Sequence, residues 1–108
     1  MDKTISLSVD QAGGATATLV AAITGKRIRV VSLVLSVSGA VSTTKSTLQD
    51  GTANTVRATL VGDATTPVVF SFKGSDKDPA FETAVSESLE LVTGASAAIS
   101  GFLTYQYV

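Results

Sequence analysis

Few residues in this 108-residue chain could act in catalysis or metal binding, because it contains no histidine and no cysteine. That absence excludes Ser-His-Asp and Cys-His nucleophiles, imidazole ligation of zinc, thiolate catalysis and disulfides. Ser42 and Lys45 match the S-x-x-K spacing of a serine nucleophile with a lysine base. Such a pair needs a helix N-terminus to bring the lysine onto the serine, whereas this stretch is polar and extended. The sequence therefore favours a solvated strand here.

A second candidate is the acidic group Asp76, Asp78 and Glu82, in and just after the most polar loop of the chain. Carboxylate oxygens are the ligands that calcium prefers. However, Ala80 and Phe81 occupy positions where an EF-hand loop would need a ligand and a glycine. The sequence favours a solvated loop, and we predict no catalytic residue, no metal ligand and no cofactor.

Residues suited to binding a partner are easier to find. The group Lys26, Arg27 and Arg29 could meet a carboxylate surface on a partner, since Arg27 and Arg29 share a strand face. Such residues also serve as the solvated end of a strand or as gatekeepers against aggregation. Tyr105 and Tyr107 suit an interface because tyrosine buries a ring and keeps a polar tip, but alternate tyrosines are also ordinary sheet packing. Both alternatives stay open.

Composition limits the classes of partner. Eight Lys and Arg against nine Asp and Glu give a net charge of −1, so no broad field attracts nucleic acid or anionic lipid. The apolar stretch 19–23 is too short to cross a bilayer, and the first residues lack the pattern of a secretion leader. We expect synthesis in a cytoplasm without a cleaved leader. Aromatic residues make up only 6% and tryptophan is absent, so stability from self-association is expected.

The elements that position these residues centre on the stretch 26–38, KRIRVVSLVLSVS, the densest apolar run. It predicts a buried central strand of about a dozen residues, where roughly five or six is usual. The alternation changes phase at Val30 and Val31. Either a β-bulge there restores one apolar face, or both faces are covered, as at a subunit contact. Val34, apolar on the serine-rich face, favours double coverage.

The rest of the chain reads as further strands with turns between them and no helical period. Residues 41–49 are rich in Ser and Thr and predict a polar strand near a sheet edge. Asp50-Gly51 after it is a hairpin signal. Further apolar alternation marks strands in the ranges 5–10, 15–23, 54–61, 68–72, 81–91 and 97–108. We predict an all-β fold, a single domain over 1–108 built as a jelly-roll-like antiparallel β-sandwich of about eight strands.

Five segments also carry a family resemblance. They are Gly25 to Ser32 with Gly39-Ala40-Val41, then Phe81 to Ala84, Glu87 to Leu91, and Gly101 to Tyr105. Together they resemble small virion proteins of tailed bacteriophages, the closest group being the capsid decoration, or cement, proteins encoded among head genes. The similarity runs intermittently over about four-fifths of the chain, and its motifs are structural. One position departs from the pattern, because Ser86 stands where the related proteins usually have glycine, and this puts the turn geometry in doubt.

The resemblance implies a jelly-roll-like sandwich, a homotrimer that binds the outer surface of an icosahedral head and clamps copies of the major capsid protein. It also implies location in the virion after synthesis in the host cytoplasm, and no catalysis. The subunit or partner contacts are then expected at Lys26, Arg27, Arg29, Val34, Tyr105 and Tyr107. Two alternatives remain, another virion position (head fibre, neck or tail) and a carbohydrate-binding module on the same fold. An enzyme would rest on the acidic group alone.

Overall fold

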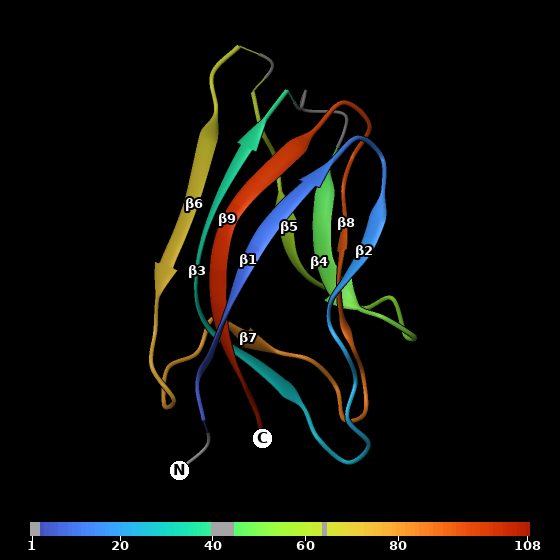
Figure 1. The fold of residues 1–108 in the computed structure, drawn as a ribbon, viewed down its shortest axis with the longest axis vertical. Helices are drawn as coiled ribbons and strands as arrows, with labels where there is room; N and C mark the ends of the chain where they lie inside the picture. Colours follow the sequence, from blue (N-terminus) through green and yellow to red (C-terminus); the bar gives the residue numbers. More distant parts are fainter. Residues whose placement is uncertain (1–2, 40–44, 64) are drawn as a thin grey trace.

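The computed structural model describes residues 3–39, 45–63 and 65–108, which form two antiparallel sheets and no helix (Figure 1). Within these ranges the strands are β1 (Ile5–Ala12), β2 (Thr16–Val20), β3 (Ile28–Ser38), β4 (Ser46–Asp50), β5 (Val56–Leu60), β6 (Val68–Lys73), β7 (Phe81–Glu82), β8 (Leu89–Val92) and β9 (Ala98–Tyr107).

The connectivity is that of a long hairpin rolled into two layers. β1 pairs with β9, β2 with β8, β3 with β6 and β4 with β5, so the first half of the chain runs antiparallel to the second. Rolling produces one sheet in the order β1-β9-β3-β6 and another in the order β2-β8-β4-β5. The short β7 adds to the first sheet at the start of β3. The predicted jelly-roll-like sandwich is confirmed, with the added β7 making nine strands in the described ranges.

The phase change in β3 is a bulge. Val30 lies opposite Tyr105 and Ser32 lies opposite Thr104, so Val31 is the extra residue. The bulge brings the residues before and after it onto one inward face. Five inward side chains of β3 are therefore buried in the core between the sheets: Ile28, Val30, Leu33, Leu35 and Val37. Of the two predicted explanations, the bulge is the one observed, while Val34 on the opposite face is only half-buried.

The strand predicted over residues 41–49 was expected near a sheet edge, and for its described part, residues 45–49, that position is wrong. β4 begins at Ser46 and lies between β8 and β5, inside the second sheet. Its polar residues misled the prediction because two of them point inward with partners. Ser46 is buried and its hydroxyl accepts a hydrogen bond from the amide of Gly94 at 2.9 Å. Asp50 is also buried and paired. The hairpin predicted at Asp50-Gly51 is confirmed, since β4 and β5 pair directly across it.

Gly101 allows β9 to pack closely beside β3. Its φ is 145°, a conformation that L side chains rarely adopt. A Cβ at this position would clash with the backbone carbonyl oxygen of Val34. Gly101 lies opposite Leu35 on one neighbouring strand and Val9 on the other, so β9 has no room to shift away.

We expect Gly101→Ala to lower the free energy of unfolding by about 3 kcal/mol, because the clash adds to the backbone strain. Gly13→Ala is the matched control, since Gly13 has a φ of 66° but no neighbouring atom within 4 Å of the added Cβ. That variant should lose only about 1–2 kcal/mol, from backbone strain alone. Urea denaturation measures both. Equal losses would contradict a close-packing role for Gly101.

Candidate interaction surfaces

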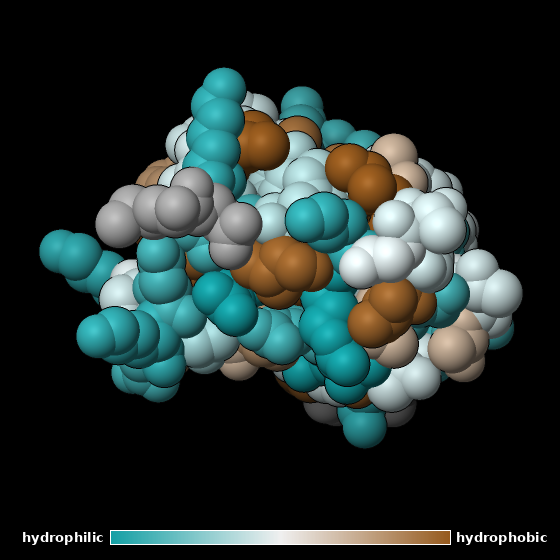
Figure 2. Space-filling model, turned by 90° about the horizontal axis from the view of Figure 1, so that it is seen from below, coloured by the Kyte–Doolittle hydropathy of each residue, from teal (hydrophilic) through white to brown (hydrophobic). Residues whose placement is uncertain are grey.

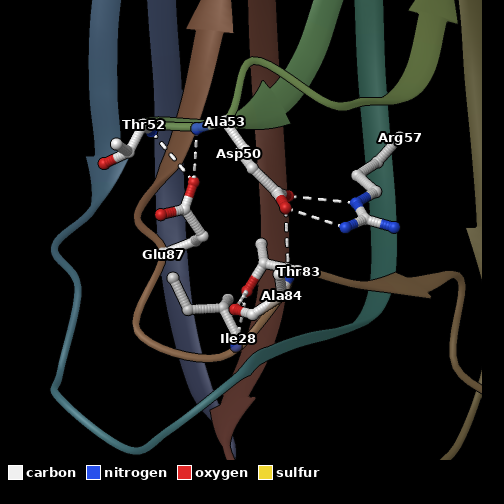
Figure 3. Close-up of polar contacts among 8 residues, drawn as sticks. All are labelled: Ile28, Asp50, Thr52, Ala53, Arg57, Thr83, Ala84 and Glu87. Carbon is white, nitrogen blue, oxygen red and sulfur yellow. Dashed lines mark hydrogen bonds and ion pairs between the residues drawn. The ribbon is translucent and has the colours of Figure 1, made fainter.

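A buried ion pair anchors one end of the sandwich (Figure 3). The carboxylate of Asp50 is fully buried and accepts hydrogen bonds from the Nε and Nη2 atoms of Arg57 at 3.0 and 2.7 Å. It also accepts one from the amide of Ala84 at 3.1 Å. Asp50 thus ties the end of β4 to β5 and to the segment that follows β7.

A bulge in β5 makes this pair possible. Leu48 lies opposite Ala58, and Gln49 lies opposite Val56, so Arg57 is the extra residue. Without the bulge, strand alternation would place Arg57 and Ala58 on opposite faces and turn the arginine outward. With it, the arginine reaches the inward Asp50 while its side chain keeps 29% exposure. The sequence carried no signal that joined these two residues.

The pKa of Asp50 is lowered despite its burial. Burial alone would raise the pKa, but the hydrogen bonds from Arg57 and the Ala84 amide, together with the arginine charge, lower it further than burial raises it. The carboxylate therefore stays ionised in the folded protein. Its chemical role is to hold three segments together.

Other polar groups near this ion pair also bind loops (Figure 3). Oε1 of Glu87 accepts hydrogen bonds from the amides of Thr52 and Ala53 at 2.9 and 2.7 Å. The buried hydroxyl of Thr83 accepts one from the amide of Ile28 at 3.0 Å. These contacts fasten the β4–β5 turn and the start of β3 to the segment between β7 and β8.

Ser86, the position where the resemblance would have glycine, lies in a turn with positive φ. Ser86 has a φ of 65°, the left-handed conformation that glycine favours. Its hydroxyl accepts a hydrogen bond from the amide of Gly25 at 2.9 Å, and its own amide donates to the carbonyl of Lys26 at 2.8 Å. The serine thus adopts a conformation that glycine would favour, and its hydroxyl adds a hydrogen bond that glycine could not accept.

The predicted basic group is divided in the structure. Lys26 and Arg27 are exposed, whereas Arg29 is half-buried and its Nε lies 2.7 Å from Oε2 of Glu82. The Arg29 charge is thus already compensated within the chain. Lys26 and Arg27 present their charges to solvent at the end of the molecule that carries both termini.

The two predicted tyrosines pack against the core. Their rings meet edge to face with centroids 5.7 Å apart, and the hydroxyl of Tyr107 donates to the carbonyl of Ala21 at 2.7 Å. Burial, with a smaller effect of Tyr105, raises the pKa of Tyr107. Both residues are half-buried, so the part of each ring that is not covered remains available to a partner.

Val34 belongs to an exposed apolar group on the outer face of the β1-β9-β3-β6 sheet. It lies opposite Phe102 of β9, which is 47% exposed, and is flanked diagonally by Val69 of β6, which is 61% exposed. We call Val34, Phe102 and Val69 the outer-face cluster. The rest of this face is mostly short and polar, with Ser6, Ser8, Asp10, Ser32, Ser36, Ser71, Ser100 and Thr104. The sequence showed Val34 out of phase with the core, but it did not show that Phe102 is its neighbour.

The end that carries both termini has a different surface. Hydrophobic residues form small separate patches there, divided by hydrophilic residues (Figure 2). Ile23 and Val85, each nearly half exposed, flank the Gly25–Ser86 contact near Lys26 and Arg27. A partner that binds at this end would contact both apolar and basic side chains.

The acidic group does not come together as a ligand set. The Oδ1 atom of Asp76 accepts a hydrogen bond from Gln106 at 2.9 Å, while Glu82 pairs with Arg29. Over 3–39, 45–63 and 65–108, no three potential metal ligands converge, no pocket is present, and no helix is long and apolar enough to cross a membrane. Ser42 of the S-x-x-K motif lies outside the described residues.

Similarity to known proteins is found in the fold and not in the sequence. No family model and no curated protein matches the sequence. A chain of the cyanophage Pam1 capsid asymmetric unit is similar at 18% identity and a TM-score of 0.47, covering 97% of this chain and 84% of that one. A chain in the structure of infectious bursal disease virus Gx strain is similar at 21% identity and a TM-score of 0.41. That match covers 100% of this chain but only 32% of the viral chain.

We expect Arg57→Met to lower the free energy of unfolding at neutral pH by about 3 kcal/mol, because it leaves the buried carboxylate of Asp50 unpaired. Arg29→Met, which breaks the more exposed pair with Glu82, should cost less than about 1 kcal/mol. Denaturant unfolding of both variants measures the contrast.

The loss in Arg57→Met should also depend on pH. A lowered pKa stabilises the fold above the ordinary carboxyl pKa of about 4, and this contribution disappears as the pH falls through the lowered value. The difference between the wild type and Arg57→Met should therefore shrink in acid. A difference that is constant between neutral pH and about pH 2 would mean that packing, not charge, is lost.

Proposed function

We propose that this chain is a structural virion protein of a tailed bacteriophage, a capsid decoration protein that binds the outer head surface as a homotrimer. Its partner is the major capsid protein, and it works without catalysis or a cofactor. Lys26, Arg27, Val34 and the uncovered parts of Tyr105 and Tyr107 supply contacts to other subunits, and Arg29 supports them through its pair with Glu82.

The observation that carries the proposal is how the segments of the family resemblance meet. Arg29 pairs with Glu82, and Val30 lies opposite Phe81 on one side and Tyr105 on the other. Residues spread along most of the chain thus form one connected framework around the start of β3. A resemblance limited to turn composition would have no reason to select mutually contacting residues.

The outer-face cluster supports a surface role. Apolar side chains that stay exposed on a flat sheet lose water contact when another subunit covers them, which favours association by roughly 25 cal/mol for each Å² of apolar surface covered. The serines and threonines around the cluster can form hydrogen bonds at the rim of such a contact.

A protein of this kind acts by mass action. Each bound copy that touches two capsid subunits favours the assembled lattice over separated subunits, because it binds the lattice better. Its function then depends on the area and shape complementarity of its contacts with capsid subunits.

The test compares three aspartate substitutions on β3. Val34→Asp should fold normally but weaken assembly and binding to heads of the encoding phage by about tenfold or more, because it buries a charge in an apolar contact. Leu35→Asp should prevent folding, since Leu35 is fully buried in the core. Ser36→Asp is the comparison on the same face. It lies opposite Val69 at the rim of the cluster, where an added charge keeps contact with water, so it should weaken head binding less than Val34→Asp.

Circular dichroism reports folding, and cosedimentation with heads that lack the protein reports binding. Wild-type protein that stays in the supernatant would overturn the decoration role. Equal effects of Val34→Asp and Ser36→Asp would remove Val34 from the contact.

A further inference from the structure

The β6 strand forms an open edge of the first sheet (Figure 1). All six of its residues pair with β3 without a register shift, from Lys73 opposite Ser32 to Val68 opposite Val37. Among the described residues, no strand pairs with β6 on the side away from β3. Its outward backbone amides and carbonyls therefore lie ready for another strand.

The side chains of β6 do little to protect this edge. Val69 is the most exposed large apolar residue of the described chain at 61%, and Phe72 is 37% exposed although it lies opposite the inward Leu33. The only charge is Lys73 at the end of the strand. No proline, glycine or charged residue interrupts residues 68–72.

The other edge strands in the described ranges are protected in ways that β6 is not. The pairing of β2 shifts register between Thr18 and Val20, and β5 carries the bulge at Arg57. β1 bears the exposed carboxylate of Asp10 within the strand. Bulges and charges are the common means of preventing edge-to-edge pairing, so the flat apolar edge of β6 stands out.

We propose that β6 pairs antiparallel with β6 of a second copy, with Ser71 opposite Ser71 of that copy. This register places Phe70 opposite Phe72 twice on the inward side, giving two aromatic cross-strand pairs. On the outward side it places Lys73 opposite Val69, so the two lysines do not face each other.

β6 is thus complementary to a second β6 strand, and we therefore infer that a second copy of the chain binds at this edge. Alternation of faces, aromatic pairing and separation of like charges are all satisfied by the same six residues read in the opposite direction. The contact is isologous and closes after two copies. It goes beyond the proposed function and does not depend on it, since a threefold contact would use another surface.

Single-cysteine variants test the register directly, because the chain contains no cysteine. Residues directly opposite in an antiparallel pair have Cα atoms about 4.5–5.5 Å apart, within disulfide range. Ser71→Cys should therefore form a covalent dimer on mild oxidation, seen on a non-reducing denaturing gel.

Two controls make the test specific. Val69→Cys lies on the same face of β6 but would be opposite Lys73, about 13 Å from its counterpart along the strand. Ser8→Cys lies in the same cross-sheet row as Ser71, on the other edge strand β1. Neither should form the dimer at the rate of Ser71→Cys. No dimer from Ser71→Cys, or equal dimer formation by either control, would overturn the proposal.

Lysine substitutions test the same pairing without a covalent bond, through their effect on the dissociation constant. Ser71→Lys places two lysines opposite each other and should raise the dimer dissociation constant about fivefold or more in sedimentation velocity. Ser8→Lys should leave the dissociation constant unchanged. An unchanged value for Ser71→Lys, or a monomeric wild type at tens of micromolar, would contradict the pairing.

Discussion

The bulge at Val31 is the constraint on which the rest of the structure depends. It places Ile28 and Val30 on the same inward face as Leu33 and the later core residues of β3. Without it, strand alternation would turn one of these two sets toward solvent. Each such side chain contributes about 1.5–3 kcal/mol on burial, so a flat β3 would forfeit a large part of the stability of a small domain.

Several polar side chains of the protein form hydrogen bonds that hold its loops in place. Asp50 binds Arg57 and the Ala84 amide, Glu87 binds the β4–β5 turn, and Ser86 binds Gly25. These groups fix the turns and segments at one end of the sandwich. What the molecule offers to partners is surface: an apolar cluster among hydroxyl groups, a basic end and an unprotected strand edge.

Local patterns predicted most of the strands, since alternation marks β1, β3, β6, β8 and β9 without reference to any neighbour. The bulge was one of two alternatives, because a phase change in one strand does not say whether the other face is covered. The position of β4 was mispredicted. Its inward Ser46 and Asp50 look solvent-exposed until their partners Gly94 and Arg57 are known, and both partners are distant in sequence or turned by a bulge.

The candidate surfaces were predicted less completely for the same reason. Val34 was identified from its phase, but its neighbour Phe102 comes from the last strand, and only the sheet register joins them. Arg29 and the tyrosines were assigned as possible contacts from type and spacing. Their partners within the chain, Glu82 and Ala21, became known only with the fold.

We propose that the inward face of β3 holds the sandwich together, while its outward face serves assembly. Electron cryo-microscopy of the mature phage head tests this most directly. We expect density for this chain on the outer head surface, with Val34 and Phe102 covered by a neighbouring subunit. A head surface that lacks the chain, or that holds it with both side chains facing solvent, would contradict the assembly role of this face.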